Sequence, residues 1–160
     1  MIVDAVLQAL PHLGHQALFG AIAAAGFGVL FNFGLAMLIW CGAAGALALA
    51  VRTFGQDLGW SLEAASFAAA LTTSCGAILV RRWLGAASAG VALAGCIPMV
   101  PGAFFGHALL GFFAVTTFQP NDAITAVVDA MQYMLRVCFT LGAIGAGLAI
   151  PTHLIRNPDY

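Results

Sequence analysis

Long apolar segments separated by short polar connections run along the whole chain. Five of them are expected to be helices, at about residues 13–32, 35–53, 61–81, 87–118 and 123–150. About 20 apolar residues, rising 1.5 Å each, cross the roughly 30 Å hydrocarbon core of a bilayer. Each segment reaches about this length, so the pattern predicts an all-α membrane protein with a bundle of about five transmembrane helices.

Polar residues mark the predicted ends of these helices. The first ends at Asn32 and the second closes at Arg52, while Ser61 suits the N-cap of the third. The third stops at Arg81–Arg82, and the fifth is expected to stop at Pro151.

The fourth segment is interrupted by the sequence CIPMVPG, which carries Pro98, Pro101 and Gly102. A proline inside a helix removes a hydrogen bond and costs roughly 3 kcal/mol. The two prolines leave the carbonyls of Ala94 and Ile97 without their helical donors, and a new half-helix starting at Gly102 would direct its unpaired amides at the break. The fourth helix is therefore predicted to be broken at the PMVPG segment.

Broken backbone is tolerated at membrane depth only where protein or a water-filled cavity satisfies its polar groups. Discontinuous helices of this kind form substrate and ion sites in secondary transporters, with the amide end directed at anions. The break therefore predicts a transport site. A proline kink that serves only helix packing remains the alternative.

Composition agrees with a membrane location, since 62% of the residues are hydrophobic and 7% are charged, against about 25% charged in soluble domains. The net charge of −1 and the lack of a basic stripe argue against nucleic-acid binding. The cysteines stand singly in apolar runs, so neither metal nor cofactor is expected. Residues 1–160 are expected to form a single membrane domain.

The few positive charges predict an orientation, because Lys and Arg favour cytoplasmic loops. Placing Arg81, Arg82 and Arg156 inside puts the amino terminus outside and the carboxyl terminus inside for five spans. Among the arginines near predicted helix ends, Arg52 is the one that this arrangement places on the opposite side.

Two charges fall inside the fifth predicted span, Asp129 and Arg136. They are seven residues apart and thus share a helix face. Intramembrane charges usually face a protein interior or a water cavity. Arg136 is a candidate for binding a carboxylate, and Asp129 for titrating or holding a cation. The alternative is a structural pair satisfied by neighbouring helices.

Two further residues are candidates for ion or proton coupling, His107 and Glu63. A histidine in apolar surroundings could carry a proton, but it could equally be a hydrogen-bonded packing residue. Glu63 lies in the first turn of its span, where an acid also stabilises the helix dipole. Glycines at close spacing, such as Gly42 with Gly45, predict close helix packing, either within the bundle or on another membrane subunit.

Five segments resemble the threonine/serine exporter family in their order along the chain, between about residues 20 and 151. They are GFGVLFN, WCGAAGALALAVR, WSLEAASFAAAL, IPMVPG and GAGLAIP. The chain is most similar to the small subunit of the split form of this family. The family motif maps onto Pro98, Pro101 and Gly102, and onto Asn32 and Glu63. This chain departs from it at Phe33-Gly34, where relatives often have Val-Pro.

The resemblance implies an exporter of small carboxylates in the bacterial inner membrane. Some relatives export threonine and serine, and the split form, which has a larger partner subunit, is linked to succinate efflux. A structural or assembly subunit, whose partner carries the transport site, is the alternative. An enzyme is not expected, because paired carboxylates, Ser/His pairs and metal-spaced clusters are absent from the sequence.

Overall fold

The structure is a computed structural model that describes residues 2–114 and 120–154, without the side chains of residues 2–10, 86 and 120–123. Arg156 and the end of the fourth predicted segment lie outside these residues. The elements are α1 (Ile2–Leu30), α2 (Leu35–Asp57), α3 (Leu62–Leu79), α4 (Arg81–Leu84), η1 (Gly85–Ala87), α5 (Ser88–Cys96), η2 (Ile97–Met99), α6 (Gly102–Ala114) and α7 (Pro120–Leu154).

Four helical stretches of the described chain are long and apolar enough to cross a bilayer. They are Pro11–Leu30, Leu35–Asp57, Leu62–Leu79 and Ile124–Leu154. The pair Ser88–Met99 and Gly102–Ala114 makes a fifth if it is counted as one broken span. These helices confirm the prediction of an all-α membrane protein whose fourth span is broken at the PMVPG segment.

Three predicted helix ends are wrong. The first helix begins at Ile2 rather than at about residue 13. The second helix continues past Arg52 to Asp57, so that Arg52 lies inside the helix rather than at its end. The last helix passes through Pro151 and ends at Leu154. The predicted cap is confirmed, because the Ser61 side chain accepts a hydrogen bond from the amide of Ala64.

Pro151 lies in the last turn of α7, which ends at Leu154. A proline there leaves one carbonyl, that of Gly147, without its helical donor. Two hydroxyl groups bond other carbonyls nearby: the Ser74 Oγ donates to the carbonyl of Leu148 at 3.0 Å, and the Thr152 Oγ1 donates to the carbonyl of Ala149 at 2.7 Å. The sequence shows the proline but not these bonds.

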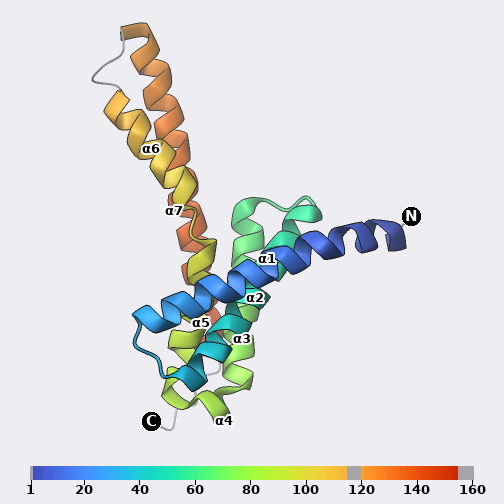
Figure 1. Ribbon diagram of the computed structural model, residues 1–160. Helices are drawn as coiled ribbons and strands as arrows, with labels where there is room; N and C mark the ends of the chain where they lie inside the picture. The colour runs from blue at the N-terminus through green and yellow to red at the C-terminus, as the bar shows by residue number, and fades with distance from the viewer. Residues whose placement is uncertain (1, 115–119, 155–160) are drawn as a thin grey trace. The chain divides into compact units, whose positions relative to one another are not determined.

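The described chain forms two compact units, which are residues 2–99 with 143–154, and residues 100–114 with 120–142. In the first, α1, α2, α3 and α5 pack on one another (Figure 1). Glycine permits the closest approaches, since a Cβ on Gly20 of α1 would lie 2.6 Å from the carbonyl oxygen of Gly45 of α2. A Cβ on Gly95 of α5 would lie equally close to the Cβ of Ala44.

The core of the first unit consists of small and medium side chains. One cluster joins Met99 to α2, α3 and the end of α7, and contains Ala48, Ala69, Ala70, Cys96 and Ile144. The other surrounds Cys41 and contains Leu84, Val91 and Ala94. Cys41 and Cys96 thus pack as small hydrophobic residues.

The second unit consists of α6 and the first part of α7, which run side by side (Figure 1). They approach closely at Gly111, where an added Cβ would lie 2.8 Å from the Cβ of Ala130. Because a single domain was predicted and no finding decides between one domain and two, that expectation stays a prediction.

Candidate functional site

The break in the fourth span lies between α5 and α6. The 3₁₀ turn Ile97–Met99 follows α5, and α6 begins at Gly102. The amide of Gly102 donates to the carbonyl of Val100 at 2.8 Å, and that of Phe105 donates to the carbonyl of Pro101 at 3.2 Å. The prediction that the Gly102 amide is unpaired is therefore wrong, because the short connection folds back on itself.

Arg52 of α2 binds the backbone at this break. Its Nη1 donates to the carbonyl of Met99 at 2.7 Å, and its side chain is partly buried. Met99 is fully buried, so the bond satisfies a polar group that the end of the helix leaves without a regular helical partner. From its sequence position, Arg52 was expected only at the end of the second helix, on the side of the membrane opposite to the other loop arginines. Arginine within an apolar membrane helix often marks a functional site, so its position could have indicated Arg52 as a candidate site residue.

A cavity of about 370 Å³ adjoins this bond, within the first unit. Arg52 and Pro98 line it together with other residues of α1 and α2, most of them polar, namely His12, Gln16, Leu49, Thr53, Gln56 and Asp57. Its size lies within the roughly 300–1,000 Å³ typical of small-molecule sites. One predicted site residue, Pro98, therefore lines this cavity together with Arg52, a cation that was not predicted to be a site residue.

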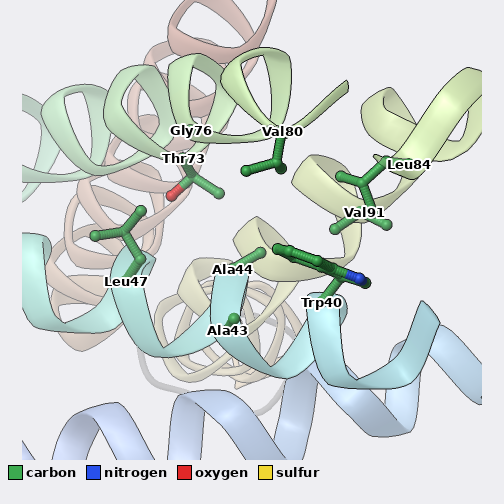
Figure 2. Close-up of a pocket in the computed structure, with 10 residues that line it drawn as sticks. Trp40, Ala43, Ala44, Leu47, Thr73, Gly76, Val80, Leu84 and Val91 are labelled. Carbon is green, nitrogen blue, oxygen red and sulfur yellow. The ribbon is translucent and has the colours of Figure 1, made fainter. Parts of the chain in front are cut away.

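A second cavity, of about 160 Å³, is apolar (Figure 2). Trp40, Ala44 and Leu47 of α2 face Thr73 and Val80 across it. Its one hydroxyl, that of Thr73, donates to the carbonyl of Ala69 within its own helix. A third cavity, of about 310 Å³ and lined by α3, α5 and α7, is also mainly apolar. The lining of neither cavity suits a charged ligand.

The hydroxyls of α3 differ in their hydrogen-bond partners. Thr72 and Thr73 bond carbonyls of their own helix, as most hydroxyls in membrane helices do. Ser74 instead bonds α7. The Oγ of Ser66 is buried and has no hydrogen-bond partner among the described residues.

Asn32 has a structural role at the end of α1. Its φ is 58°, in the left-handed region. Its amide donates to the carbonyl of Val29, and the amide of Phe33 donates to that of Gly28, which together make a Schellman C-cap. Phe33 packs against Gly90 near the start of α5, whereas Pro98 follows the end of that helix. Asn32 therefore lies away from the cavity.

Glu63 lies in the first turn of α3, beside the Ser61 cap. A carboxylate there interacts favourably with the amides at the helix amino terminus, which is one of the two roles that the sequence suggests for Glu63. The other role, in ion or proton coupling, stays a prediction.

The other candidates lie in the second unit. The rings of His107 and Tyr133 are 5.4 Å apart, Phe104 stacks on Tyr133 at 5.9 Å, and the Arg136 guanidinium lies 5.2 Å from the Phe104 ring. Asp129 and Arg136 are both exposed on α7. They share a helix of this unit but do not line the cavity beside Arg52.

A family model described as "Threonine/Serine exporter, ThrE" matches residues 16–154. The chain belongs to the threonine/serine exporter family. The family resemblance predicted from the five segments is thereby confirmed. No solved structure matches this chain.

Membership in a family of exporters, together with the apolar helices, identifies this chain as a multi-pass membrane transport protein. In this exporter the predicted site residues separate into different places. Pro98 adjoins the polar cavity, Asn32 and Glu63 lie at helix ends, and Arg136 with its neighbours lies on the α6–α7 hairpin. Among the residues that the structure describes, no three His, Cys, Asp or Glu side chains group as metal ligands.

Proposed function

We propose that this chain is one subunit of a two-component exporter of small carboxylates, either threonine and serine or succinate-like dicarboxylates. The observation that carries the proposal is the bond from Arg52 to the broken backbone at Met99, beside a polar cavity. An arginine held in a membrane helix suits recognition of a carboxylate. A helix broken at the same place is a common feature of transporter sites.

A larger membrane subunit is proposed as the partner, and the α6–α7 hairpin supports this. Asp129 is exposed there beside large apolar side chains such as Leu135 and Phe139. A charge facing lipid at the bilayer centre would cost roughly 2.5–3.5 kcal/mol on insertion scales. A Cβ added at Gly102 or Gly106 of α6 would meet no atom within 4 Å, which leaves room for close approach of another helix. A second copy of this chain is the other possible occupant.

Within this proposal, Pro98, Pro101 and Gly102 form the moving backbone at the substrate site. Arg136 is proposed as a second carboxylate contact, and Asp129 and His107 as the groups that couple transport to an ion or proton gradient. For Asn32 and Glu63, the C-cap and the first-turn position support structural roles more than substrate or ion contacts.

The proposed location is the bacterial inner membrane, with the amino terminus outside and the carboxyl terminus inside. Arg81 and Arg82 adjoin Trp83, whose ring stacks on that of Trp40 at 5.9 Å. Tryptophan is enriched at membrane interfaces and arginine at the cytoplasmic one. These residues support placing the α3–α4 junction at the cytoplasmic face.

Efflux measurements test the proposal. Pro101→Ala, Arg136→Gln and Asp129→Asn should each reduce export of threonine or succinate when the partner is present and membrane levels match the parent chain. Cys138→Ala, on an exposed residue of the same helix as Arg136 and Asp129, serves as the control that should retain export. If all three variants retain full efflux, the transport-site proposal is wrong.

An assembly subunit is the second candidate, and the exposed hairpin is the observation that favours it. Reconstitution separates the two candidates. Efflux that needs both chains, and that falls with changes in this one, supports the two-component exporter. Efflux by the partner alone supports an assembly role, and efflux by this chain alone contradicts the need for a partner.

A further inference from the structure

The polar cavity contains both signs of charge, which the two apolar cavities described above lack. Arg52 contributes a cation and Asp57 an anion, and both are on α2 near its carboxyl end. The remaining polar lining consists of the amides of Gln16 and Gln56, the Thr53 hydroxyl and the His12 imidazole. Such a lining fits a small molecule that itself carries both charges.

We propose that this cavity binds the α-amino-acid head group of the exported substrate, with Arg52 at the carboxylate and Asp57 at the ammonium group. The inference rests on the proposed function and specifies its site and substrate class. A zwitterion neutralises both lining charges at once, whereas a single cation or a single anion leaves one of them without a partner.

Arg52 is suited to the carboxylate because its guanidinium has five N–H donors, and the Met99 carbonyl accepts from one nitrogen, Nη1. The other donors can therefore bind a carboxylate while the backbone contact persists. The partly buried position strengthens such a pair relative to one in water. Pro98 lines the same cavity, so the bound head group would lie against the broken segment.

The remaining lining favours a hydroxyl side chain on the ligand. Thr53 is 7% exposed, and the amides of Gln16 and Gln56 are each able to donate and accept hydrogen bonds. Serine and threonine present one hydroxyl beyond the head group, which these residues can bond. A dicarboxylate would instead bring a second negative charge into a cavity that already contains Asp57.

Binding of labelled L-threonine to the full chain, purified with its partner where transport requires it, tests the site. Arg52→Gln should weaken threonine binding about tenfold or more, as loss of a hydrogen bond to a charged group does. Asp57→Asn should weaken threonine binding while leaving competition by succinate unchanged or stronger. Threoninamide, which lacks the carboxylate, should compete poorly with threonine in the parent chain.

Two further variants serve as controls for misfolding. Arg52→Lys keeps the charge without the planar fork, so it should retain the fold and bind threonine more weakly than the parent. Arg82→Gln removes an exposed arginine that lies over the Trp83 ring, away from the cavity, and should leave threonine binding unchanged.

The inference and the proposed function fail in different ways. If the parent exports threonine and the folded Arg52→Gln and Asp57→Asn variants bind and export it normally, the site is wrong and the exporter stands. If succinate binds more tightly than threonine, and Asp57→Asn does not alter that preference, the amino-acid assignment is wrong. If the parent, with its partner, exports neither compound, both proposals are wrong.

Discussion

Asn32 illustrates how one residue can serve backbone geometry and still resemble a binding residue in sequence. Asparagine tolerates a positive φ better than most side chains, and glycine tolerates it best. The family motif marks this position, but the motif alone does not separate a substrate contact from a C-cap. The hydrogen bonds to Val29 and Gly28 favour the cap.

Asn32→Gly should therefore retain both stability and export, because glycine adopts a φ of 58° readily. Asn32→Val should lower stability by about 1–2 kcal/mol, because a β-branched residue is strained there. Thermal unfolding in detergent, combined with efflux assays, measures both. Loss of export in a stable Asn32→Gly protein would support the substrate contact instead.

The sequence contains enough information to select Arg52 as unusual but not to identify its role. An arginine among apolar residues is visible at once, but its acceptor, the Met99 carbonyl, lies 47 positions away. The same limit applies to Ser74, whose hydroxyl bonds α7 rather than its own helix. Contacts that depend on tertiary packing do not follow from local pattern.

Transmembrane helices were predictable because apolar length decides whether a segment can cross a bilayer. The end of α7 at Leu154 rather than at Pro151 was not, because a proline in the last turn of a helix removes only one hydrogen bond. The break at Pro98 and Pro101 was predictable because two prolines three residues apart disrupt a helix. The hydrogen bonds at the break, from Arg52 to Met99 and from Gly102 to Val100, were not, since their acceptors are backbone carbonyls that no sequence pattern marks.

Packing of α1 on α2 depends on glycine at the crossing. Gly20→Ala should destabilise the first unit by about 1–3 kcal/mol, because the new methyl would lie 2.6 Å from the carbonyl oxygen of Gly45, which is backbone. A lower midpoint of thermal unfolding in detergent is the expected result.

Gly14→Ala in the same helix is the matched control. No atom lies within 4 Å of the position its methyl would take, so the midpoint should stay the same or rise. Equal midpoints for the two variants would contradict close packing of α1 on α2 at Gly20.

At the scale of the whole molecule, α3 is expected to cross the membrane from one face to the other. It has 18 residues, which at the rise of an α-helix span about 27 Å, close to the thickness of a hydrocarbon core. Leu58 precedes its amino end and Arg82 follows its carboxyl end, so these residues should lie on opposite sides of the membrane. The assignment of Arg82 to the cytoplasmic side and of Leu58 to the outer side depends on the positive charges.

Cysteine labelling in intact cells tests the orientation. In a chain whose native cysteines (Cys41, Cys75, Cys96 and Cys138) are replaced by alanine, Leu58→Cys should react with an impermeant maleimide from outside. Arg82→Cys should react only after the membrane is permeabilised, because the positive residues favour the cytoplasm. The reverse pattern would show that the amino terminus is inside, and the cysteine-free parent sets the background.

The contact between Arg52 and Met99 also has a thermodynamic consequence. The same guanidinium is proposed to hold both the carbonyl and the ligand, and loss of the carbonyl contact would leave a buried acceptor unsatisfied, at roughly 1–3 kcal/mol. Coupling of this kind is reciprocal, so a change that loosens the backbone at the break must alter ligand affinity by the same factor, typically about 5–150-fold. Substitutions at positions of CIPMVPG that do not line the cavity would then shift ligand affinity without contacting the ligand, and a bound ligand would in turn stabilise the backbone at Met99.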